Sequence, residues 1–134
     1  MRRSGTIVTV CILGIVACAT ILADEKPTAA YQKAMKDLST ANQALRAEVK
    51  IIESAGAYPD YTTLDKHVTV LRSAFSATLA YWNEKKVDDA IKLTEAGLKG
   101  VEDLEKAAKD KSYDSLVASS TAIASTCASC HKAH

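Results

Sequence analysis

The residues with the clearest chemical potential are two cysteines and a histidine in the run Cys127-Ala128-Ser129-Cys130-His131. Cys-x-x-Cys-His is the spacing at which c-type haem is attached. The two thiols form thioethers with the two porphyrin vinyl groups, and the adjacent imidazole is then held against the iron. On a helix these residues stand at i, i+3 and i+4, on one face. The run therefore predicts one covalent haem c per chain, with His131 as the proximal iron ligand.

Three other uses of the same residues compete with haem attachment. A thiol–disulfide redox centre normally opens a helix in a βαβ fold, whereas this motif follows a helical segment, where the helix dipole does not stabilise a thiolate. A zinc site of Cys127, Cys130, His131 and His134 would lack a second, separated ligand pair. A Cys127–Cys130 disulfide would close a very short loop and stabilise little. A non-haem helical bundle with that disulfide remains the alternative outside haem proteins.

Helical segments must position this motif. Apolar residues recur at intervals of three and four, and no stretch shows the sustained alternation of a strand. The segments are expected at about 28–54, 60–84, 87–109 and 113 to the end. Thr28 is the expected N-cap of the first segment and Gly56 its C-cap. Four such helices with short loops predict an all-α, four-helix up-down-up-down bundle.

The segments differ in how well they can fill a core. The first carries the stripe Tyr31, Met35, Leu38, Leu45, Val49 and Ile52, with Asn42 in the gap. The last consists of small residues from 118 to 126, apart from Ile123, and so leaves space beside it. In the third, Gly97 and Gly100 weaken the helix but allow another backbone to approach closely. A planar cofactor attached to the last helix would fill the missing core volume.

The first 23 residues have the pattern of a signal peptide. Basic residues at the start precede an apolar run of secretory length, and a small residue stands before Asp24. The run Ile15-Val16-Ala17-Cys18 also resembles a lipobox, which would make Cys18 a lipidated first residue. Either reading predicts export to the periplasm, as a soluble or a lipid-anchored protein. The haem-binding bundle is then expected at residues 24–134.

Charge and composition exclude several function classes. Without residues 1–23, Lys+Arg falls from 17 to 15 while Asp+Glu stays at 16, so the net charge is near −1. A chain without a basic field is not expected to bind nucleic acid. No Ser/His/Asp set or carboxylate pair stands out, so the protein is not expected to be an enzyme.

The layout resembles the class II c-type cytochromes, the cytochrome c′ and c556 group. The resemblance rests on an export signal, four helices and Cys127-x-x-Cys130-His131 in the last helix. It implies a haem packed inside the bundle, with His131 as proximal ligand. Relatives with a sixth iron ligand take it from a methionine on the first helix, where Met35 stands. Relatives usually carry an aromatic residue and an arginine after the motif, and neither occurs here.

The sixth iron position decides the expected function. His134 shares a helix with His131 and cannot reach the opposite side of the porphyrin, and His67 lies beside its helix's stripe as a partly exposed residue. Met35 is therefore the candidate distal ligand. With Met35 bound, the protein transfers single electrons to an unidentified redox partner; without it, five-coordinate iron binds a gas such as NO or CO. A homodimer is compatible with either function.

Overall fold

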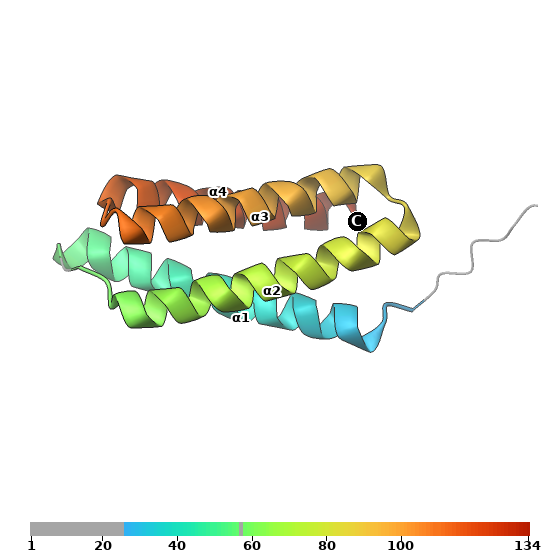
Figure 1. Cartoon of the computed structure of the whole chain (residues 1–134), viewed down its shortest axis with the longest axis horizontal. Helices are drawn as coiled ribbons and strands as arrows, with labels where there is room; N and C mark the ends of the chain where they lie inside the picture. The colour runs from blue at the N-terminus through green and yellow to red at the C-terminus, as the bar shows by residue number, and fades with distance from the viewer. Residues whose placement is uncertain (1–25, 57) are drawn as a thin grey trace, which may run out of the picture.

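The computed structural model describes residues 26–56 and 58–134, and these form four helices. They are α1 (Ala29–Ala55), α2 (Tyr61–Lys85), α3 (Asp88–Lys109) and α4 (Tyr113–Ala133). Each runs antiparallel to the one before it, so the predicted four-helix bundle is confirmed (Figure 1). The helix ends fall within one residue of the predicted ones. The signal segment 1–23, with Cys18, lies outside the described residues.

Helix ends follow from local side-chain chemistry. The Thr28 hydroxyl accepts a hydrogen bond from the backbone N–H of Tyr31 at 3.2 Å, which caps α1 as predicted. Gly56 ends α1 with a left-handed φ of 61°, and its N–H donates to the Ile52 carbonyl. Asp60 caps α2 by accepting from the N–H of Thr62 and the hydroxyl of Thr63. These two bonds, with the Thr63 hydroxyl contributing most, lower the pKa of Asp60.

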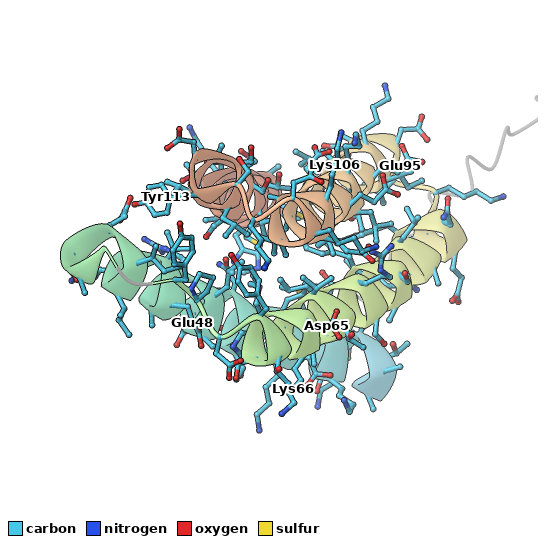
Figure 2. All side chains as sticks on the ribbon, turned by 60° about the vertical axis from the view of Figure 1, so that its left-hand side comes forward. Glu48, Asp65, Lys66, Glu95, Lys106 and Tyr113 are labelled. Carbon is cyan, nitrogen blue, oxygen red and sulfur yellow. The ribbon has the colours of Figure 1, made fainter. Side chains whose placement is uncertain are left out.

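The core lies between two layers, with α1 and α2 in one and α3 and α4 in the other (Figure 1). Its largest fully buried side chains come from all four helices: Leu45, Leu64, Leu71, Leu104, Ile123 and Val101. The three sequential helix pairs pack closely, whereas α1 and α4 touch least. Charged residues such as Lys66, Glu95 and Lys106 lie on the outside (Figure 2). The bundle is therefore tightly packed except along its α1–α4 side.

The two glycines of α3 explain part of this asymmetry. A Cβ atom built on Gly100 would lie 2.9 Å from Cγ1 of Ile123 and 3.9 Å from its Cα, so α4 approaches α3 closely there, as predicted. At Gly97 the close neighbour is instead the ring of Phe75 on α2, and a Cβ would lie 2.3 Å from its nearest atom. Gly97 thus makes room for the single phenylalanine of the chain.

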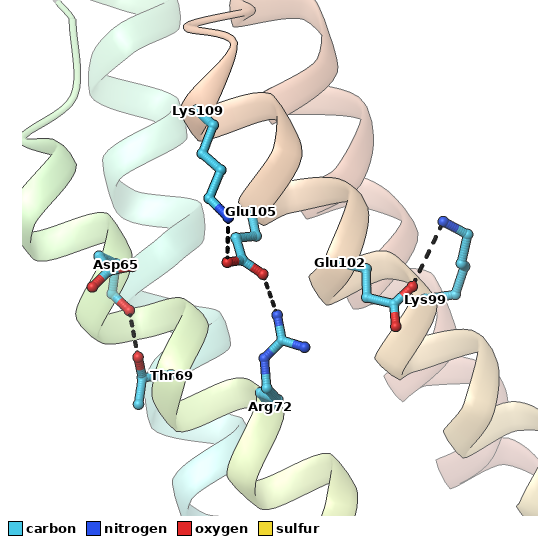
Figure 3. Close-up of polar contacts among 7 residues, drawn as sticks. All are labelled: Asp65, Thr69, Arg72, Lys99, Glu102, Glu105 and Lys109. Carbon is cyan, nitrogen blue, oxygen red and sulfur yellow. Dashed lines mark hydrogen bonds and ion pairs between the residues drawn. The ribbon is translucent and has the colours of Figure 1, made fainter.

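In the described part of the chain, no helix is long and apolar enough to cross a membrane. On the outer surface of the bundle, a network of ion pairs joins α2 to α3. Glu105 of α3 pairs with Arg72 of α2 and, at 2.8 Å, with Lys109 one turn further along α3 (Figure 3). The Lys109 hydrogen bond and charge, followed by Arg72, lower the pKa of Glu105.

Because of this network, the free energy of unfolding should depend on pH. Because the folded state binds the Glu105 proton less readily than the unfolded state, this stabilisation is present above pH 4.5 and is lost as the pH falls through the lowered pKa. We expect Glu105→Gln to flatten the fall in unfolding free energy between about pH 6 and pH 3. Denaturant titrations at several pH values measure how the free energy of unfolding changes with pH. Glu102→Gln, which removes an exposed carboxylate that pairs with Lys99 of the same helix, is the matched control.

Candidate functional site

A pocket of about 260 Å³ lies on the loosely packed side of the bundle. Every residue predicted for the site lines it: Met35 from α1, and Cys127, Cys130 and His131 from α4. Its floor comes from α2 and α3, through Phe75, Thr78, Leu93 and Thr94. Residues nearly a hundred positions apart in the sequence thus meet around one space.

The pocket exists because α4 offers too little side-chain volume. A second, wider hollow of about 760 Å³ adjoins it, lined only by α1 and α4. From α4 this hollow is lined by Val117, Ser120, Thr121, Ala124, Ser125 and Ala128, all small except the valine. Gln43, Arg46 and Ala128 line both spaces, so the two form one groove. The space expected beside residues 118–126 therefore lies between α4 and α1.

The two cysteines face this groove as free, partly buried thiols. Burial raises the pKa of Cys127, and the neighbouring Cys130 raises it further. Burial also raises the pKa of Cys130, with a smaller contribution from Asp89. A thiol–disulfide redox centre needs the opposite shift, because its attacking cysteine works as a thiolate at neutral pH. The raised pKa values of the two thiols are therefore opposite to what that use of the motif needs.

Across the groove, Met35 is partly buried and packs against the core. Leu38 and Phe75 beside it are buried. Thr78 and Thr94 of the floor are buried too, but their hydroxyls donate to carbonyls of their own helices, so the inner wall is largely apolar. Asn42, one turn beyond Leu38, has a buried side-chain oxygen with no hydrogen-bond partner. His67 of α2 is half-buried, as expected, and does not line the pocket. His131 is exposed and lines the pocket from α4 together with the two cysteines.

An aromatic cluster closes the end of the bundle next to the motif. Tyr31 stacks on Tyr81 with ring centroids 4.0 Å apart, and both contact Trp82 edge-on. His134 packs against Trp82 at 5.1 Å, and its Nε2 lies 3.2 Å from a carboxylate oxygen of Asp89. Burial, then Cys130 and Tyr81, raise the pKa of Tyr31 to about 12. The cluster fixes the last turn of α4 against α2 and α3.

Sequence reasoning missed several polar residues of the pocket wall, among them Gln43 and Arg46. Arg46 stands one turn after Asn42, next to the apolar stripe of α1, and this spacing was the available signal. This spacing points to the pocket only when it is known which side of the bundle is open.

Among residues 26–56 and 58–134, no three His, Cys, Asp or Glu side chains converge to hold a metal ion by themselves. Cys127, Cys130, His131 and His134 are accordingly not brought together as such a group within these residues. Two thiols and an imidazole on one wall, with a thioether on the opposite wall, fit the donors of a covalently attached haem with histidine and methionine as axial ligands.

No family model matches the chain, and no curated protein or solved structure is significantly similar to it.

Proposed function

We propose that the chain is an exported, mono-haem c-type cytochrome of class II type that acts in one-electron transfer. One observation carries the proposal: a single pocket is lined by Cys127, Cys130 and His131 from one side and by Met35 from the other. Residues 1–23 would direct export, and the redox partner would be a separate protein.

The dimensions of the groove support this cofactor. From Met35 to Arg46 the pocket follows α1 for eleven residues, which is about 16 Å of helix. The pocket and the adjoining hollow together reach the volume of ordinary cofactor sites. The buried wall is largely apolar, because the hydroxyls of Thr78 and Thr94 are bound within their own helices, and the rim is polar. A porphyrin has a matching apolar body and two carboxylates.

Each side chain has a definite task in this proposal. Cys127 and Cys130 would anchor the porphyrin through thioethers, and their position one turn apart on α4 keeps His131 beside the iron. Met35 would supply the second axial ligand from α1, and Leu38 and Phe75 exclude water around it. Haem iron supplies a one-electron couple whose potential depends on its axial ligands and on burial. Met35 and His131 stand on helices that each pack closely against a neighbour, α1 against α2 and α4 against α3. This packing limits ligand movement when the iron's charge changes, which favours electron transfer.

Gas binding is the second candidate function. It requires that Met35 leave the sixth position open, so that Leu38, Phe75 and Met35 form an apolar chamber for NO or CO. The same pocket supports both candidates, and the state of Met35 separates them.

The test is the intact mass and absorption spectrum of protein exported together with the haem-maturation machinery. We expect the mass of the chain from Asp24 plus one haem, and a low-spin spectrum that CO does not change. A mass lower than the chain's by two protons would show a disulfide and overturn the proposal. A high-spin spectrum that shifts with CO would replace electron transfer by gas binding. The control is Cys127→Ser/Cys130→Ser, which should carry no covalent haem.

A further inference from the structure

Arg46 is a cation without a partner at the centre of the α1–α4 groove. It lines both the pocket and the adjoining hollow, and its side chain is exposed at their junction. Within the described residues it forms no ion pair or hydrogen bond. The nearest acidic residue along the groove, Glu53, is seven residues further along α1, about 10 Å away by helix rise. Among the described residues, Lys50, one turn beyond Arg46, is the other Lys or Arg that lines the groove.

The pocket's polarity is graded along its length. Leu38, Phe75 and Leu93 line the pocket near Met35. The buried Thr78 and Thr94 also line it, but their hydroxyls are bound to carbonyls of their own helices, so this part of the wall is largely apolar. The end beside Arg46 is polar, through Gln43 and the unpartnered side-chain oxygen of Asn42. The graded wall fits a ligand whose apolar body lies near Met35 and whose anionic edge reaches Arg46.

We propose that Arg46 recognises the carboxylates of the porphyrin and so sets its orientation in the groove. This inference rests on the function proposed above. The vinyl-bearing edge of a haem lies opposite its propionate-bearing edge, and Cys127 and Cys130 fix the vinyl edge at the motif end of the pocket. The propionates then point along the groove toward Arg46. A guanidinium binds carboxylates through two parallel hydrogen bonds, which fix a direction as well as a charge. Arg46 is thus a positioning residue and makes no contact with the iron.

The experiment compares two porphyrins that differ only in their carboxylates. Ferric mesoporphyrin, which has no vinyl groups and cannot form thioethers, and its dimethyl ester are each titrated into the cofactor-free chain from Asp24 onward. Trp82 is the single tryptophan and lies in the aromatic cluster next to the motif, so quenching of its fluorescence reports binding. We expect the diacid to bind about tenfold more tightly than the diester, the strength of a partly screened charge pair.

The variants separate recognition from folding. Arg46→Gln should bind both porphyrins equally, and Arg46→Lys should restore part of the preference. Lys36→Gln removes the same charge from an exposed site of α1 outside the groove and should keep the full preference. Equal affinities in the parent chain, or a preference that survives Arg46→Gln, would overturn this inference and leave the proposed function intact. If neither porphyrin binds, the proposed function fails as well.

Discussion

Replacing Met35 by leucine is expected to convert the haem-loaded protein from low-spin to high-spin and to open its iron to CO. Met35 lines the same pocket as His131 but comes from the facing helix, which is the arrangement two axial ligands need. Leucine keeps most of the volume and removes the sulfur, so the change would report lost ligation and not a cavity. Thioether ligation also raises the reduction potential, so the variant's potential should fall. Absorption spectra of both oxidation states, with and without CO, measure the first effect.

The control for Met35→Leu is Leu93→Ala. Leu93 lines the same pocket from α3, is partly buried and carries no ligating atom. Its truncation enlarges the pocket, so a spectrum that stays low-spin in this variant ties the change to the sulfur of Met35. A low-spin spectrum that persists in Met35→Leu would contradict ligation by this residue. A parent protein that is already high-spin and binds CO would make Met35 part of the wall of a gas-binding chamber.

The helices and the motif could be predicted because both are local properties of the sequence. Thr28 and Gly56 act at the ends of α1 through hydrogen bonds to residues three and four positions away. The spacing of Cys127, Cys130 and His131 likewise places them on one helix face without reference to the rest of the fold. The small residues of α4 predicted a space, because a helix of alanine and serine cannot fill a bundle core.

The residues that complete the site depend on tertiary arrangement. The predicted stripe of α1 treated Tyr31 and Met35 as core positions, but both are only partly buried, and Ala34 and Ala41 take fully buried places. Met35 borders the pocket, because α4 does not pack closely on α1 there. Tyr31 instead stacks on Tyr81 and contacts Trp82 at the end of the bundle. The contact of Trp82 with His134 joins residues 52 positions apart, and no local pattern indicates it.

Replacing Gly97 by alanine is expected to lower the free energy of unfolding by about 1–3 kcal/mol, the cost of overpacking a filled core. Helix propensity alone predicts the opposite, a gain of about 1 kcal/mol, because alanine is the better helix former. The steric term should win because the new Cβ would lie within 2.8 Å of three ring atoms of Phe75, a side chain only 3 % exposed. Chemical denaturation of the two proteins measures the difference.

The direction in which Phe75 can yield links this prediction to the site. Phe75 lines the pocket, so the free space open to a displaced ring is the space proposed for the porphyrin. Gly97→Ala should therefore also reduce covalent haem incorporation, measured as the haem-loaded fraction by intact mass. Phe75→Leu removes the ring, so the double variant Gly97→Ala/Phe75→Leu should lose less stability than the two single changes added together. Strict additivity, or a Gly97→Ala variant more stable than its parent, would show that this contact does not constrain the core. If stability and haem loading fall together, Gly97 is the residue that keeps the pocket open. Without a side chain at this position, the Phe75 ring can pack against the backbone of α3 and stay out of the pocket.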